Sequence, residues 1–207
     1  MHSNQQLIDH LIASGVLRSL SLINAFKKCD RIDFVPEEFR PYAYEDRPLP
    51  ISNGQTISQP YTVAIMLELL QPHSGDKVLD IGSGSGWTTA LLATTVGESG
   101  FVEGIDIIPS LVEYGKENLQ TAGIYNASIS LIDSQILGKP GRRYDRILVS
   151  ASAPEMPRAL FDQLKSGGTL VIPVQNSIWR LTKHEDETFD AYELPGFVFV
   201  PLIGSKT

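Results

Sequence analysis

The sequence has little cysteine and no long apolar run. Cys29 is its single cysteine, which excludes an intrachain disulfide framework and fits a reducing compartment. No apolar stretch approaches the ~20 residues that a membrane-spanning helix needs. Residues 1–6 carry none of the positive charge typical of a secretion signal. We therefore expect a cytoplasmic protein without a membrane partner.

Positive charge is also scarce. The chain has 17 Lys and Arg residues against 24 Asp and Glu residues, for a net charge of −7. A protein that binds nucleic acid usually displays a basic face, because neutralising phosphates supplies much of the affinity. The basic pairs at 27–28 and 142–143 are short and are typical of a solvated surface. We expect no nucleic-acid partner.

Histidine is sparse, and its spacing indicates neither a metal site nor a catalytic triad. The four histidines are His2, His10, His73 and His184. No two of them stand at the short spacing of a typical ligand pair, and Cys29 has no histidine near it in the sequence. We therefore expect no metal ion and no cysteine nucleophile.

The composition otherwise fits one folded domain, with 42% hydrophobic and 20% charged residues. The first part of the chain predicts short helices at 7–12 and 22–26, because apolar residues recur there at helical spacing. Five prolines between residues 33 and 60 exclude a regular helix and predict an ordered, irregular segment. A helix is expected at 61–70.

From residue 77 onward, runs that predict strands alternate with runs that predict helices. This alternation is typical of a mostly parallel sheet with helices on both faces, and two final runs around an acidic turn predict a hairpin. The fold class is therefore α/β: a doubly wound, mostly parallel seven-stranded sheet with an antiparallel C-terminal hairpin. The strands are expected at 77–81, 101–105, 128–132, 144–150, 169–174, 177–183 and 189–194, and the later helices at 87–96, 109–122 and 156–164, with a turn at 165–168.

A glycine-rich loop follows the first of these strands. Gly82, Gly84 and Gly86 let backbone amides approach a ligand without an intervening Cβ. A dinucleotide fingerprint would place its third glycine five positions after the first, where this chain has Trp87 or Thr89, and no Gly-Lys-Ser/Thr sequence suits a triphosphate. By itself the loop also fits a tight structural turn.

Asp106 ends the second strand and can accept hydrogen bonds from both hydroxyls of a ribose. Its alternative role is to place a negative charge at the N-terminus of the helix that begins near Pro109. A glycine loop with a ribose-binding acid, but without a phosphate site, favours an adenosine ligand such as S-adenosylmethionine. The sulfonium cation of that ligand suits an acidic pocket.

Several motifs resemble the protein-L-isoaspartate O-methyltransferase family, in family order and over nearly the whole chain. The most specific is Gly-Gln-Thr-Ile-Ser-Gln-Pro at 54–60, because general methyltransferases share only the glycine loop. The others are Phe-Val-Pro-Glu at 34–37, Tyr-Ala-Tyr-Glu-Asp-Arg-Pro-Leu-Pro-Ile at 42–51, Val-Leu-Asp-Ile-Gly-Ser-Gly-Ser-Gly at 78–86, Tyr-Asp at 144–145, Ala-Pro at 153–154 and Phe-Val-Pro-Leu at 199–202.

The resemblance implies a repair enzyme that moves a methyl group from S-adenosyl-L-methionine to the α-carboxylate of L-isoaspartyl residues in damaged proteins or peptides, leaving S-adenosyl-L-homocysteine. It implies one methyltransferase domain over 1–207, in which 1–60 forms part of the substrate cleft and 61–207 binds the donor. A monomer is expected. In this reading Ser58 is catalytic, and the substrate is bound by Thr56, Ile57 and Ser58. The donor-binding residues are Gln55, Thr56, Asp80, Gly82, Ser83, Gly84, Gly86, Asp106, Ile107, Asp133 and Ser134.

Residue reasoning alone leaves Ser58 open between two roles. A serine just before Pro60 is a typical N-cap of the following helix, and a cap serine also lies where helix amides meet an anion. The resemblance favours the active site. A neutral hydroxyl can orient a carboxylate and leave its nucleophilicity intact, whereas a paired arginine would reduce it.

Three positions depart from the family pattern: the loop after Val174 is short and lacks a glycine, Ser134 replaces a usual glycine, and Val198 stands where arginine is frequent. The first and third lie at the rim of the substrate cleft. They leave two alternatives open, namely a methyltransferase for another carboxylate or small-molecule acceptor, and a non-catalytic adaptor that binds isoaspartyl segments.

Overall fold

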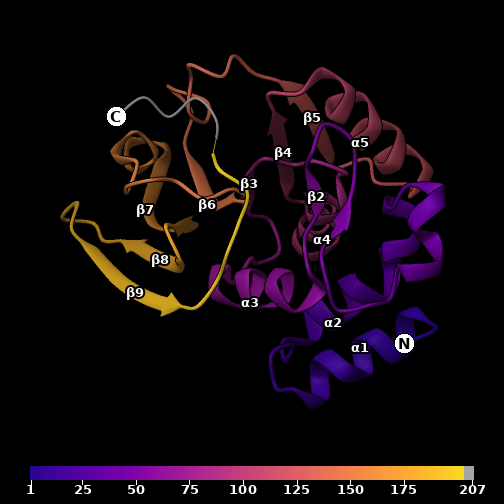
Figure 1. Cartoon of the computed structure of the whole chain (residues 1–207). Helices are drawn as coiled ribbons and strands as arrows, with labels where there is room; N and C mark the ends of the chain where they lie inside the picture. The colour runs from indigo at the N-terminus through magenta and orange to yellow at the C-terminus, as the bar shows by residue number, and fades with distance from the viewer. Residues whose placement is uncertain (203–207) are drawn as a thin grey trace.

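A seven-stranded sheet runs through the molecule, and the computed structural model describes residues 1–202 (Figure 1). Within this sheet, the five strands that come first along the chain are parallel, and the last two are antiparallel. The α/β class and the C-terminal hairpin are thus confirmed. The strands are β3 (Lys77–Ile81), β4 (Phe101–Asp106), β5 (Ala127–Leu131), β6 (Tyr144–Val149), β7 (Leu164–Val174), β8 (Ser177–Lys183) and β9 (Phe189–Pro195).

The strand order creates one place where the chain reverses direction across the sheet. The order is β5-β4-β3-β6-β7-β8-β9, so the chain moves outward from β3 through β4 to β5 and then returns to the other side of β3. In open α/β sheets, ligands bind outside the carboxyl ends of the strands at this reversal. The glycine loop follows β3 at that point.

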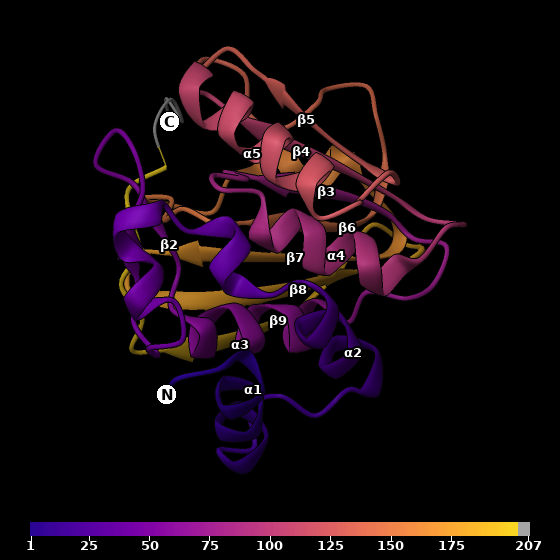
Figure 2. The same ribbon diagram turned by 90° about the vertical axis from the view of Figure 1, so that its right-hand side faces the viewer.

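Alternate residues along the strands enter two different cores. Val78 and Leu148 face the layer of α-helices, whereas Leu79 and Ile147 face the opposite side, as the two-residue period of a strand requires. Figure 2 shows the helices in front of the sheet. This layer contains α3 (Pro60–Leu70), α4 (Trp87–Val96) and α5 (Pro109–Thr121). The other side is covered by a short 3-10 helix, η3 (Arg158–Gln163), whose Leu160 is fully buried.

The chain before α3 forms a layer of short elements. Two helices, α1 (Asn4–Ala13) and α2 (Leu20–Lys28), pack beside the helix layer, with α2 against α4. The proline-rich segment is ordered and irregular, as predicted. It contains two 3-10 helices, η1 (Arg31–Phe34) and η2 (Glu37–Tyr42), and a small antiparallel hairpin of β1 (Leu49–Pro50) and β2 (Thr56–Ile57).

Two local predictions were wrong. The helix expected at 156–164 is only η3, because Pro157 precedes it with extended backbone and Leu164 is already extended and paired with Tyr144. The turn expected at 165–168 belongs to β7, where it bulges out of the ladder: Tyr144 pairs with Leu164, but Arg146 pairs with Thr169. Within residues 1–202, no helix is long and apolar enough to cross a bilayer.

Candidate active site

A cavity of about 910 Å³, open to solvent, lies at the carboxyl ends of the central strands. Three parts of the chain form it: the ends of β3, β4, β5 and β6 with the segments that follow them, the β1–β2 hairpin, and the C-terminal residues 200–202. Figure 2 shows the hairpin and the C-terminal segment at the same end of the sheet. The cavity thus lies between the proline-rich segment and the α/β sheet.

The glycine loop forms one wall of this cavity. Gly82 and Gly84 line it and have φ values of 80° and 50°, a backbone region that residues with a Cβ rarely adopt. Gly86 does not line it. A Cβ at Gly86 would lie 3.0 Å from the carbonyl oxygen of Gly115 in α5, so this glycine allows close packing of the loop against a helix.

Asp106 is buried and joins the loop to α5. Its Oδ2 accepts a hydrogen bond from the Gly84 amide at 3.0 Å, and its Oδ1 accepts one from the Ile108 amide at 3.0 Å. Ile108 is the N-cap of α5, so the helix-terminal role considered for Asp106 is present. A carboxylate has about four acceptor positions, which leaves capacity on both oxygens for a ligand's hydroxyls.

Asp80 lies beneath the loop and not in the cavity wall. Its side chain is fully buried, and its Oδ2 accepts a hydrogen bond from the Thr89 hydroxyl at 2.6 Å. Burial away from water raises the pKa of Asp80 to about 7. The geometry fits support of the loop and of α4 from below.

Apolar side chains form a further part of the cavity wall. Asp133 is exposed, its Oδ1 accepts from the Gln135 amide at 2.8 Å, and neither it nor Ser134 lines the cavity. The donor roles of Asp80, Gly86, Asp133 and Ser134 therefore stay predictions. The apolar wall consists of Ile108, Leu111, Ile132, Ile136 and Leu137.

The β1–β2 hairpin closes the cavity on the other side. Ile51 approaches the glycine loop, since a Cβ on Gly84 would lie 3.5 Å from its Cδ1. At the hairpin tip, the Asn53 amide nitrogen donates to the Ser110 hydroxyl at 2.7 Å. The hairpin is thus hydrogen-bonded to the N-terminal end of α5. Four predicted residues of the hairpin line the cavity: Gln55, Thr56, Ile57 and Ser58.

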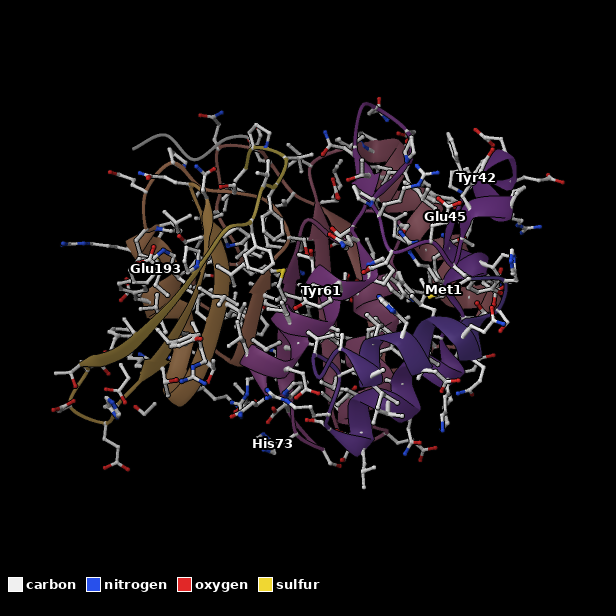
Figure 3. The ribbon with its side chains drawn as sticks, turned by 60° about the horizontal axis from the view of Figure 1, so that its bottom comes forward. Met1, Tyr42, Glu45, Tyr61, His73 and Glu193 are labelled. Atoms are coloured by element: carbon white, nitrogen blue, oxygen red, sulfur yellow. The ribbon has the colours of Figure 1, made fainter. Side chains whose placement is uncertain are left out.

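Ser58 lies in the cavity wall and does not cap the following helix. The N-cap of α3 is Gln59, whose side chain makes no capping hydrogen bond. Instead, the Ser58 carbonyl accepts a hydrogen bond from Arg31 at 3.1 Å, and the Asp46 carboxylate accepts from the Tyr61 amide at 2.9 Å (Tyr61 is labelled in Figure 3). The capping alternative was therefore wrong.

The cavity has little charge. Of its described lining residues, Asp106 alone carries a charged side chain. One buried carboxylate, a glycine loop and apolar walls fit a cationic adenosyl donor and provide no basic cluster for phosphates. Within residues 1–202, no group of acidic, cysteine and histidine side chains could hold a metal ion.

Sequence reasoning missed part of the lining. Ser150 and Ala151 follow β6, and the position of this strand beside β3 could have indicated them. The C-terminal residues 200–202 could not be placed from the sequence. They run beside Ser152, which exchanges backbone hydrogen bonds of 2.8 Å with Val200 and Leu202. Arg31, far outside the glycine loop, was also missed.

The sheet order, the glycine loop and the acid at the end of β4 together define an S-adenosylmethionine-dependent methyltransferase. A structure from Plasmodium falciparum, described as a putative protein-L-isoaspartate O-methyltransferase in complex with S-adenosyl-L-homocysteine, superposes with a TM-score of 0.86. It is 26% identical, and the match covers 99% of this chain and 100% of that one.

Sequence comparison is more specific. The family model described as protein-L-isoaspartate (D-aspartate) O-methyltransferase matches residues 2–207. A protein-L-isoaspartate O-methyltransferase of Pyrococcus horikoshii is 43% identical, over 97% of this chain and 92% of the relative. One from Methanothrix thermoacetophila is 45% identical, over 88% of each chain. The chain belongs to the protein-L-isoaspartate (D-aspartate) O-methyltransferase family.

Proposed function

We propose that this chain transfers a methyl group from S-adenosyl-L-methionine to the α-carboxylate of L-isoaspartyl residues in damaged proteins and peptides. One observation carries the proposal. A single cavity brings together the acid and glycines suited to the donor and a serine that is free of any capping role, in a chain whose family match spans nearly its whole length.

The reaction needs positioning more than acid–base chemistry. The donor supplies an electrophilic methyl group on a sulfonium sulfur. The acceptor is a terminal-type carboxylate with a pKa of ~3.5, already ionised at neutral pH, so no general base is required. Holding two reactants in line contributes up to about 7–11 kcal/mol to lowering a barrier. The chain's own residues supply this alignment.

Each side of the cavity takes one reactant. Asp106 accepts from the ribose hydroxyls, and Gly82 and Gly84 let their backbone come close to the methionine part. Thr56 and Ser58 donate hydrogen bonds from their hydroxyl groups to the acceptor carboxylate. Because these hydroxyls are neutral, the carboxylate keeps its nucleophilicity. The resulting ester can close to a succinimide, whose hydrolysis returns some normal aspartate.

The cleft between the proline-rich segment and the sheet favours a flexible acceptor. The extra backbone methylene of an isoaspartyl residue has to enter between the β1–β2 hairpin and residues 200–202, both of which line the cavity. We place the protein in the cytoplasm, as a monomer that acts on isoaspartyl-containing proteins and without a nucleic-acid partner. Residues 1–60 would contribute the acceptor side and 61–207 the donor side.

The test uses labelled S-adenosyl-L-methionine and two synthetic peptides that differ only in isoaspartate versus aspartate at one position. We expect base-labile label on the isoaspartyl peptide alone. Equal labelling of both peptides, or labelling of neither despite donor binding by calorimetry, would contradict the proposal. In the second case another carboxylate acceptor or an adaptor role would explain the chain better.

A further inference from the structure

Arg31 is a fully buried arginine that no function described so far has used. It opens η1, at the start of the proline-rich segment, and its side chain is 0% exposed. Burial lowers the pKa of Arg31 to about 10, so the guanidinium stays charged at neutral pH. Taking such a charge out of water is costly unless fixed dipoles replace the water. Its contacts should therefore be specific.

Four backbone carbonyls from one irregular segment surround this guanidinium. Nη1 donates to Ala43 at 2.8 Å and to Glu45 at 3.1 Å (Glu45 is labelled in Figure 3). Nη2 donates to Arg47 at 3.0 Å and to Ser58 at 3.1 Å. Residues 43–47 and Ser58 are held together through one side chain, in a part of the chain that has only a two-residue strand pair.

The other side of Arg31 faces the donor half. Its guanidinium carbon lies 5.4 Å from the ring centre of Trp87, within the range of a cation–π contact. Trp87 is the first residue of α4, directly after the glycine loop, and its indole nitrogen donates to the Cys29 carbonyl at 3.1 Å. Arg31 thus lies between the start of α4 and the backbone of Ser58.

The backbone around Ser58 has a second anchor. The Asp46 carboxylate accepts from the Tyr61 amide at 2.9 Å, three residues after the carbonyl that Arg31 holds. Asp46 is also the negative charge that acts on Arg31 and partly offsets the lowering of its pKa by burial. The backbone that follows the Ser58 side chain is therefore held at two points by two charged residues, neither of which lines the cavity.

We propose that Arg31 is a positioning residue of the methyl transfer, which aligns the Ser58 hydroxyl with the acceptor carboxylate by holding the Ser58 carbonyl against the start of α4. The proposal rests on the methyl-transfer function proposed above. A displacement near 1 Å in such an arrangement can cost about 100-fold in rate. Lysine at position 31 keeps the charge but cannot present the planar fork that reaches four carbonyls.

The test is a double-mutant cycle with Arg31→Lys, Ser58→Ala and the double variant, measured as kcat on the isoaspartyl peptide at saturating donor. We expect Arg31→Lys to lower kcat by about 10-fold or more while donor affinity changes less than about 3-fold. In the Ser58→Ala background, the same change should cost less than about 3-fold. If the kcat of the double variant falls by the product of the two single fold-losses, the residues act independently and the proposal is overturned.

Lys183→Met provides a matched control. Lys183 is also buried, and its ammonium approaches the carbonyls of Phe161 and Leu164 at 3.3 and 3.5 Å, remote from the cavity. Lys183→Met should lower stability, but its effect on kcat should be the same in the wild-type and Ser58→Ala backgrounds. An equal departure from additivity in this control would show that the cycle reports stability only, and would overturn the proposal.

Two further measurements cover the other outcomes. Should Arg31→Lys fail to fold, shown by lost near-UV circular dichroism, Asp46→Ala replaces it in the cycle with the same expectation and the same contradicting result. Amide exchange across residues 56–61 does not depend on the acceptor. It should quicken about 10-fold or more in the folded variant while β3 and β4 keep their protection. Unchanged exchange would overturn the proposal even if the wild-type protein methylates no isoaspartyl peptide.

Discussion

The two sides of the cavity are built in different ways. The donor side is made from the ends of regular strands, where backbone amides, Gly84 among them, are fixed by the sheet and by a buried carboxylate. The acceptor side is made from an irregular segment that a few side chains hold, chiefly Arg31 and Asp46. The geometry of the acceptor side should therefore depend on a few side chains outside the cavity, whereas that of the donor side depends on close backbone packing.

The comparison also separates binding from turnover. Asp106 acts on the donor through direct contacts that exist before reaction, so its loss should appear as lost affinity. Ser58 acts on alignment, which counts only when both reactants are present, so its loss should appear in kcat. The following changes test this division, from the largest expected effect to the smallest.

Replacing Ser58 with alanine should give the largest effect. Removal of one preorganised donor group typically costs about 100-fold or more in kcat. We expect a loss near 100-fold on the isoaspartyl peptide, with donor affinity changed less than about 3-fold. Steady-state kinetics and calorimetry measure the two quantities. The control is Ser52→Ala, an exposed hairpin serine outside the cavity lining. Equal losses of kcat and donor affinity would remove Ser58 from the acceptor side.

Asp106→Ala should give the largest loss of donor affinity. A hydrogen bond to a charged group contributes about 1.5–3 kcal/mol, so the net loss of one such bond to the ribose should weaken donor binding by about 10- to 100-fold in calorimetry. Asp133→Ala tests the predicted donor contact of this residue in the same experiment. Because Asp133 is exposed and outside the lining, its loss should cost less than about 3-fold. Unchanged affinity in Asp106→Ala would show that the ribose binds elsewhere.

Two glycines sharpen the comparison through stability. Gly86→Ala places a Cβ 3.0 Å from a backbone oxygen at a φ of 82°, whereas Gly54→Ala at the hairpin tip has a φ of 69° and meets nothing within 4 Å. The first should lower the free energy of unfolding by about 2–4 kcal/mol and the second by about 1–2 kcal/mol. Thermal unfolding checks both values. A larger loss in Gly54→Ala would contradict the close packing of the loop against α5.

The last change leaves the contacts to both reactants in place and concerns the pH dependence of stability. Folded Asp80 keeps its proton up to about pH 7, whereas in the unfolded chain it ionises near its ordinary value of 3.8. The native state therefore binds more protons between these values, and stability falls as the pH rises through this window. Asp80→Asn removes this titration, so its melting temperature should rise relative to wild type between about pH 5 and 8.

Glu103→Gln is the matched control for that measurement. Burial would raise the pKa of Glu103, but hydrogen bonds from Lys139, Tyr144 and Lys77 outweigh burial and lower it to about 2. Its stabilising effect is complete above pH 4.5 and is lost as the pH falls towards 2, so the variant's deficit should be constant between about pH 5 and 8. A pH dependence equal to that of Asp80→Asn would refute the assignment to Asp80.

Much of the donor side was predictable because its signals are local. A short apolar run followed by Gly82, Gly84 and an acid at the next strand end specifies a loop and its strands within one stretch of chain. The sheet class and the C-terminal hairpin followed from alternation and were confirmed. The helix at 156–164 failed because the pattern does not distinguish a 3-10 turn ended by an early strand from an α-helix.

The acceptor side was accessible only through the family resemblance. Nothing near Ser58 in the sequence reveals that Arg31 holds its carbonyl, or that Gln59 takes over the N-cap position. The contact between Arg31 and Ser58 joins residues 27 positions apart and depends on tertiary packing. The position of residues 200–202 in the cavity wall likewise depends on pairing with Ser152, for which the sequence has no local signal.

The most direct measurement is a crystal structure with S-adenosyl-L-homocysteine and an isoaspartyl peptide bound together. The account predicts the ribose hydroxyls on Asp106 and the α-carboxylate of the isoaspartyl residue within about 2.6–3.2 Å of the Ser58 hydroxyl, facing the donor sulfur. A carboxylate held away from Ser58, or a ribose away from Asp106, would contradict the division of the cavity into a sheet-built donor side and a segment-built acceptor side.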